Sequence, residues 1–140
     1  MSAVLNETLN PQLQSWVVSA NAAGCDFPIQ NLPFGRFRTP GASGWRIGVA
    51  IGNQVLDLRT AGLIDHADMH RLMQATRQER QALRQALSEG LRAGSTKQSA
   101  WEPALLPQSA VELGLPCEVG DYTDFYVGIH HASEIGRQFR

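Results

Sequence analysis

The stretch Trp45-Arg-Ile-Gly-Val-Ala-Ile-Gly-Asn-Gln-Val-Leu-Asp-Leu58 decides the fold of this chain. Every second residue from Ile47 to Ile51 is β-branched, and the residues between them are glycine and alanine, which is the period of a β-strand. Gly52-Asn53 is a turn signal and residues 55–58 predict a second strand, so the stretch predicts a β-hairpin. The small residues on one face would let another layer approach closely, as barrels and sandwiches require.

A helical region is predicted after the hairpin. Residues 65–75 predict a short helix with Leu72 and Met73 as core contacts. Thr76 and Glu79 have the spacing of a capping box, which predicts the start of a second helix. Its apolar residues recur on one face and its polar residues are expected to point into solvent. The apolar set is Leu83, Ala86, Leu87 and Leu91, and the outward set is Arg77, Glu79, Arg80, Gln81 and Arg84.

Loops and one further strand are predicted for the rest of the first 117 residues. Residues 21–40 are rich in glycine and proline and predict an extended segment whose apolar side chains lie across a core surface. Residues 95–107 predict a polar connection with an embedded Trp101, and residues 111–115 alternate like a strand. We place a domain boundary at about residue 117. The apolar side chains of the extended segment are Phe27, Ile29, Leu32, Phe34 and Phe37.

Composition and charge narrow the possible functions. The hydrophobic fraction of 43% and the charged fraction of 18% over 140 residues are typical of a globular, soluble protein. The formal net charge of −1 gives no broad positive field, so we expect no nucleic-acid partner. Neither a membrane-spanning apolar run nor a signal-peptide pattern is present, so we expect no membrane partner and a cytoplasmic location. Cys25 and Cys117 lack metal-ligand spacing and predict reduced thiols.

Chemically active side chains are concentrated in residues 121–140. Asp121 and Asp124 are three apart, so either could cap a helical turn or bind a hard divalent cation. One carboxylate cannot hold such an ion, and few acidic residues lie nearby apart from Glu118 and Glu134. We therefore expect the rest of such a site beyond residue 140 or on another chain.

Two adjacent histidines, His130 and His131, follow these carboxylates and cannot share one face of a helix. Histidine suits proton transfer near neutral pH, although most histidines pack or face solvent. Glu134 could pair with either imidazole, and the helical spacing from His131 through Ile135 and Phe139 predicts a face anchored in a core. A zinc site built from these histidines and a cysteine has poor spacing.

Tyr126 and Arg140 could recognise a substrate. A phenol can hydrogen-bond a substrate oxygen, and a guanidinium can bind a carboxylate through two parallel hydrogen bonds. Taken alone, each would be an ordinary buried tyrosine or surface arginine.

Three blocks of the sequence resemble the fumarylacetoacetate hydrolase family. The first is Asp26-Phe-Pro-Ile-Gln-Asn-Leu-Pro-Phe-Gly-Arg-Phe37, and the second is Arg46-Ile-Gly-Val-Ala-Ile-Gly-Asn-Gln-Val-Leu-Asp-Leu58. The third is Gly120-Asp-Tyr-Thr-Asp-Phe-Tyr126, followed by His131-Ala132 and Arg140. They follow the order of the family from about residue 26 onward.

The resemblance implies an enzyme that hydrolyses a carbon–carbon bond of 4-fumarylacetoacetate, giving fumarate and acetoacetate in tyrosine and phenylalanine catabolism. It implies an α+β, β-rich fold, with a small SH3-like β-barrel domain carrying a helical insert over residues 1–117. The first segment of a mainly β catalytic domain would occupy residues 118–140. A homodimer is also implied.

The resemblance assigns roles to four residues by position. Asp124 resembles a ligand of an active-site calcium or magnesium ion, and His131 resembles the base that activates water. Tyr126 and Arg140 resemble substrate-binding residues. The other groups of the family site match positions after residue 140, so we expect residues 1–140 alone neither to bind metal tightly nor to turn over substrate.

Some features leave alternatives open. Where the family often reads His-Ala-Thr-Asn, this chain has His131-Ala-Ser-Glu134, and the extra carboxylate could raise the basicity of the histidine or face water. A related enzyme could act on another 2-oxo or 1,3-dicarbonyl acid. A non-catalytic SH3-like interaction module is the third possibility, with the terminal cluster in a structural role.

Overall fold

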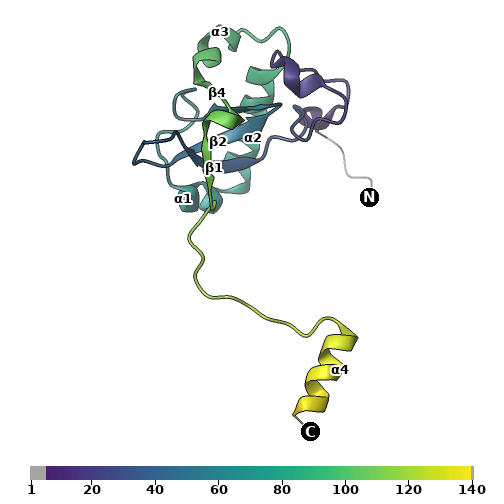
Figure 1. Cartoon of the computed structure of the whole chain (residues 1–140). Coiled ribbons are helices and arrows are strands. Elements are labelled where there is room, and N and C mark those ends of the chain that lie inside the picture. The colour runs from purple at the N-terminus through teal and green to yellow at the C-terminus, as the bar shows by residue number, and fades with distance from the viewer. Residues whose placement is uncertain (1–5, 140) are drawn as a thin grey trace.

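The computed structural model describes residues 6–139, which form a body of sheet and helices followed by a tail (Figure 1). The strands are β1 (Phe34–Arg38), β2 (Arg46–Ile51), β3 (Gln54–Asp57), β4 (Leu105–Pro107) and β5 (Glu112–Gly114). The α-helices are α1 (Met69–Gln74), α2 (Arg77–Leu91), α3 (Gln98–Trp101) and α4 (Ile129–Gln138). Short 3-10 turns are η1 (Glu7–Leu9), η2 (Val18–Asn21), η3 (Glu102–Ala104) and η4 (Gln108–Ala110).

The five strands form one antiparallel sheet in the order β4-β3-β2-β1-β5. The edges are the two short strands that come last in the sequence, and each pairs with a strand more than 40 positions earlier. An antiparallel sheet with separate helices makes the fold α+β, as predicted. That the sheet is an SH3-like barrel, and that the domain ends at residue 117, stay predictions.

The predicted hairpin is the centre of this sheet. β2 and β3 pair through Ala50 opposite Val55 and Ile51 opposite Gln54, with a two-residue turn between them. Gly52 in that turn has a φ of +57°, and a Cβ there would lie 2.6 Å from the backbone nitrogen of Ala20. Only glycine meets both demands, so the hairpin prediction is confirmed together with its turn.

The two faces of β2 are used differently. Ile47, Val49 and Ile51 point into the main core and are at most 1% exposed. On the other face, a Cβ at Gly48 would lie 2.9 Å from the Phe37 ring and would also clash with the side chain of Val55. Side chains from the neighbouring strands therefore fill the space beside this glycine.

Helix α2 closes the core against the sheet. Thr76 accepts a hydrogen bond from the Glu79 N–H, and the Glu79 side chain accepts one from the Thr76 N–H, so the predicted capping box is present. Leu87 and Leu91 are fully buried, and Gly90 lies against the Trp101 ring.

One residue of the predicted outward set of α2 was assigned wrongly. The Arg84 guanidinium donates to the Thr8 hydroxyl at 3.0 Å and to the Gln30 carbonyl at 2.6 Å. It therefore ties the N-terminal segment to the helix. The two acceptors lie 76 and 54 positions away, so no local pattern could have shown this.

Helix α1 is shorter than predicted. It begins at Met69 because the Asp68 carboxylate accepts hydrogen bonds from the next helical N–H groups and caps the helix there. Leu72 is buried as expected, but Met73 is 55% exposed, so its predicted core contact is wrong. The buried face of this short helix is centred between Met69 and Leu72, which lie one turn apart.

Strands β1 and β4 arise in segments predicted to be loops. Within residues 21–40, Ile29, Leu32 and Phe37 are buried, whereas Phe27 is half-buried and Phe34 is 38% exposed. The strand predicted over residues 111–115 is present as β5, although its leucine side chains are largely exposed.

Both cysteines are free thiols, in agreement with the prediction.

The tail, residues 115–139, leaves the edge of the sheet. Figure 1 shows it as an extended segment that ends in α4, which stands apart from the body. The Glu118 N–H donates to His70 Nε2 at 3.3 Å, close to the point where the tail departs. None of the helices formed within residues 6–139 is long and apolar enough to cross a membrane.

Candidate functional site

The predicted catalytic and binding residues lie in the tail. Helix α4 begins after Gly128, and no side chain caps it. Asp121 and Asp124 are exposed and precede that cap by seven and four positions, so the capping role considered for them is wrong for this helix. Both carboxylates face solvent in this part of the chain.

Tyr126 and His131 are brought together. Their ring centroids are 5.5 Å apart and the ring planes are inclined by 28°, so the phenol and the imidazole are stacked. Tyr126 precedes α4 and His131 lies in its first turn, so the two rings stack across the start of the helix. The phenol keeps 63% of its surface exposed.

The rest of the predicted cluster is not assembled within the described residues. Glu134 forms an ion pair with Arg137 at 3.1 Å, on the solvent side of α4, and not with either histidine. Ile135 is half-buried, while Phe139 is 83% exposed, so the predicted anchoring of that face in a core is wrong for this part of the chain. Arg140 lies outside the described residues.

A complete metal site is not formed by this part of the chain. Within residues 6–139, no group of three or more His, Cys, Asp or Glu side chains could hold a metal ion. Calcium takes six to eight oxygen ligands and magnesium six. Asp124 could supply one of them, so the residues present do not by themselves fit the predicted calcium or magnesium ion.

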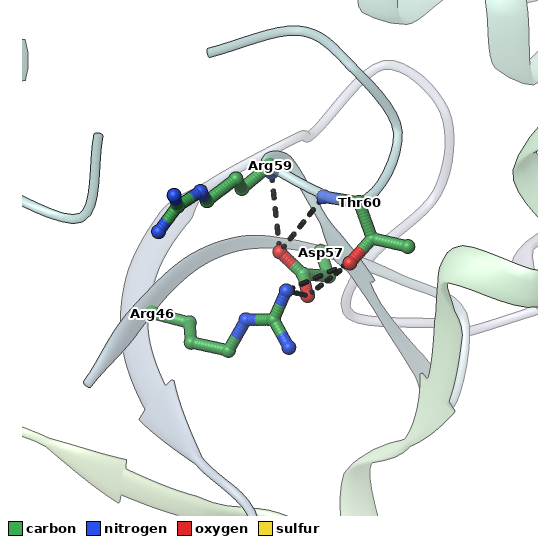
Figure 2. Close-up of polar contacts among 4 residues, drawn as sticks. All are labelled: Arg46, Asp57, Arg59 and Thr60. Atoms are coloured by element: carbon green, nitrogen blue, oxygen red, sulfur yellow. Dashed lines mark hydrogen bonds and ion pairs between the residues drawn. The ribbon is translucent and has the colours of Figure 1, made fainter. Parts of the chain in front are cut away.

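A second polar cluster, which sequence reasoning missed, surrounds Asp57 at the end of β3 (Figure 2). Its carboxylate accepts hydrogen bonds from the Arg59 N–H at 3.1 Å and from the Thr60 hydroxyl at 2.8 Å, and it pairs with the Arg46 guanidinium. Asp57 is only 1% exposed, so these partners compensate its burial. The sequence feature that could have indicated this cluster is the single carboxylate, Asp57, inside the apolar run at residues 55–58.

A bidentate ion pair joins β1 to the edge strand from which the tail departs. Arg38 Nε and Nη2 donate to the two carboxylate oxygens of Glu112 at 2.8 and 2.7 Å. These hydrogen bonds raise the pKa of Arg38 and lower the pKa of Glu112. The pair adds to the backbone pairing of β5 with β1, next to the point where the tail begins.

The structure thus defines an α+β domain built on an open antiparallel sheet, with a tail that carries the candidate catalytic side chains. The family model described as Fumarylacetoacetase N-terminal matches residues 30–116, which is most of the body. The chain belongs to the fumarylacetoacetase family and corresponds to its N-terminal part.

Named relatives agree with this membership. The chain is 40% identical over 132 residues to the fumarylacetoacetase of Caenorhabditis elegans, covering 82% of this chain and 32% of the relative. It is 38% identical to the Bos taurus enzyme and 36% identical to the Homo sapiens enzyme, each over 136 residues, 85% of this chain and 32% of the relative. The chain therefore spans about a third of the length of these relatives.

Proposed function

We propose that this chain is the N-terminal part of a fumarylacetoacetase, which hydrolyses 4-fumarylacetoacetate to fumarate and acetoacetate in tyrosine and phenylalanine catabolism. The relatives that bear this name and match more than four-fifths of the chain support the proposal. An SH3-like body, a catalytic domain that starts near residue 118, a cytoplasmic location and a homodimer belong to the same proposal.

The stack of Tyr126 on His131 is the structural observation that best supports a catalytic tail. Two side chains proposed for one reaction lie 5.5 Å apart, centroid to centroid, in an otherwise open segment. The Tyr126 hydroxyl can hydrogen-bond a substrate oxygen while the imidazole takes a proton from water beside it. Contact between the rings limits their rotation, which favours a fixed mutual orientation.

The proposed reaction gives each tail residue one task. His131 removes a proton from water as the water oxygen bonds to a carbonyl carbon of the substrate. The adduct then re-forms its carbonyl as the carbon–carbon bond breaks, and the departing enolate takes the proton that His131 removed from water. Tyr126 orients the substrate, and Arg140 binds its carboxylate. Asp124 supplies one oxygen ligand to a calcium or magnesium ion whose other ligands come from elsewhere.

Substitution of His131 tests this proposal. In a polypeptide of the relatives' length that begins with this chain, His131→Ala should lower kcat by about 10²- to 10⁴-fold, because general base catalysis typically contributes that much. His130→Ala is the matched control, since it removes the adjacent exposed imidazole. Circular dichroism would verify that both variants fold. Unchanged turnover in His131→Ala would contradict the role of His131 as the base and would favour a non-catalytic, module-like role for this part of the polypeptide.

The 140-residue chain supplies a second test. It should show no turnover of fumarylacetoacetate and no tight binding of calcium or magnesium by calorimetric titration. Strong binding of either ion by residues 1–140 would contradict the proposal that most of the ligands come from elsewhere.

A further inference from the structure

An open pocket of about 670 Å³ lies beside β2, and none of its lining residues belongs to the tail. Three segments line it: residues 41–47, which include the turn between β1 and β2; Arg59 and Thr60, which follow β3; and His66 and Ala67, which precede α1. The turn is held by the Ala42 N–H, which donates to the Thr39 carbonyl at 3.0 Å. The proposed hydrolase reaction uses none of these groups.

Two arginines give this pocket a positive wall. Arg46 is anchored by Asp57, whose carboxylate is buried behind it, while 44% of the Arg46 side chain stays exposed. Arg59 meets Asp57 only through its backbone N–H, and Figure 2 shows its guanidinium directed away from that carboxylate. Among residues 6–139, no acidic side chain lies within ion-pair distance of Arg59.

The acidic groups near the pocket are already engaged. Asp57 is neutralised by Arg46, and Asp65 pairs with Arg71 at 3.4 Å. Asp68 accepts hydrogen bonds from the first N–H groups of α1. The Arg46–Asp57 pair is neutral overall, so the positive excess of the pocket comes from Arg59, while the whole chain has a formal net charge of −1.

Trp45 also lines this pocket, and two arginines that do not line it are stacked on its ring. The guanidinium carbons of Arg36 and Arg38 lie 4.8 and 4.6 Å from its ring centroid. Arg38 is paired with Glu112, whereas Arg36 has no ion-pair partner within residues 6–139. Methyl groups of Ala42 and Ala67 add apolar surface.

We propose that this pocket binds a small organic acid through its carboxylate. The planar guanidinium of Arg59, which has no ion-pair partner among residues 6–139, matches a carboxylate in shape and charge, and the partly exposed Arg46 lines the same pocket. The apolar part of the ligand would lie against Trp45 and the alanine methyl groups, which favours an organic acid over inorganic phosphate. The site is separate from the tail, so its test does not depend on hydrolase activity.

Nuclear magnetic resonance of the 140-residue chain can test the site, with isobutyrate as the probe. The chain has three tryptophans, and their indole N–H signals report on three places. The Trp45 signal should shift saturably with isobutyrate. Those of Trp16, whose indole donates to the Gly90 carbonyl, and of Trp101, which is 5% exposed, should not shift. Isobutyramide and sodium chloride at equal ionic strength should leave all three unchanged.

Arg59→Gln should weaken isobutyrate binding by about fivefold, the effect expected for one exposed ion pair. Arg77→Gln is the matched control, because it removes an exposed arginine of α2 that does not line the pocket, and it should bind normally. Equal binding by Arg59→Gln, equal shifts of all three indoles, or an equal response to isobutyramide would overturn the proposal. Tighter binding of inorganic phosphate than of isobutyrate would overturn the choice of an organic acid.

Discussion

The body and the tail of this chain show opposite relations between packing and chemistry. In the body, Val49, Leu56 and Leu87 are fully buried, and the buried carboxylate of Asp57 has its partners in place. In the tail, α4 has no buried residue, and Val127 is 91% exposed. The candidate catalytic side chains therefore lie in the segment where residues 6–139 provide the least packing around them. Burial of apolar side chains stabilises the body, whereas the side chains of α4 are not buried.

The largest difference is expected in the response to a lost apolar side chain. Leu87→Ala removes a fully buried side chain and should lower the free energy of unfolding by about 3 kcal/mol, through lost burial and a residual cavity. Val127→Ala in the tail should change it by less than about 0.5 kcal/mol. Urea denaturation followed by circular dichroism measures both. A tail variant as damaging as the body variant would show that residues 115–139 pack on the body in solution.

A lost carboxylate should give the next largest difference. Asp57→Asn replaces a buried charge that holds the turn after β3 and should cost about 2 kcal/mol, because the partly exposed Arg46 loses its ion pair. Asp124→Asn, at an exposed tail position, should leave thermal stability unchanged. Thermal unfolding of the two variants at one pH makes the comparison. Equal melting temperatures for Asp57→Asn and the parent chain would contradict the role given to this turn.

Substitutions at the N-cap positions of α2 and α4 should give a smaller difference in the free energy of unfolding than the loss of a carboxylate. Thr76→Ala removes the cap of α2 and should cost about 1 kcal/mol at neutral pH. Gly128→Ala at the start of α4 removes no side-chain cap and should leave the free energy of unfolding of the body unchanged. Chemical denaturation of both variants measures this contrast.

The α2 cap should also depend on pH. Hydrogen bonds from the Thr76 side chain and backbone lower the pKa of Glu79 below its ordinary 4.5. A lowered folded-state pKa contributes stability above the unfolded value, and this contribution is lost as pH falls through the folded value. The cost of Thr76→Ala should therefore shrink in acid. Glu79→Gln, which keeps a capping side chain without a titrating group, should abolish this pH dependence.

The smallest expected effect is a change in chemical shift, and it concerns the contact between the Tyr126 and His131 rings. Tyr126→Leu should remove the ring-current shift that the stacked phenol imposes on the His131 ring protons, with no change in the stability of the body. Tyr122→Leu, at a tyrosine that is 87% exposed, is the control. Proton nuclear magnetic resonance reads both. Unchanged His131 signals in Tyr126→Leu would show that the rings do not meet in solution.

Sequence patterns predicted the elements whose contacts are local. The hairpin around Gly52-Asn53 and the capping box of Thr76 depend on residues within a few positions of each other, and both are present. Strands β1 and β4 were not predicted, because their sequences do not alternate between apolar and polar residues. They become strands by pairing with neighbouring strands of the sheet. Among the candidate site residues that the structure describes, Tyr126 and His131 lie together, and the roles of all four, Asp124, Tyr126, His131 and Arg140, stay predictions.

The sequence by itself determined the central hairpin, the second helix, and the family signature that runs from the body into the tail. Only the tertiary structure decided that Arg84 binds the N-terminal segment, that Arg46 pairs with the buried Asp57 of the neighbouring strand, and that Arg46 and Arg59 line one pocket. The physical reason is separation along the chain. Turns and caps join neighbours in sequence, whereas buried ion pairs and pockets form between distant segments once the core has brought them together.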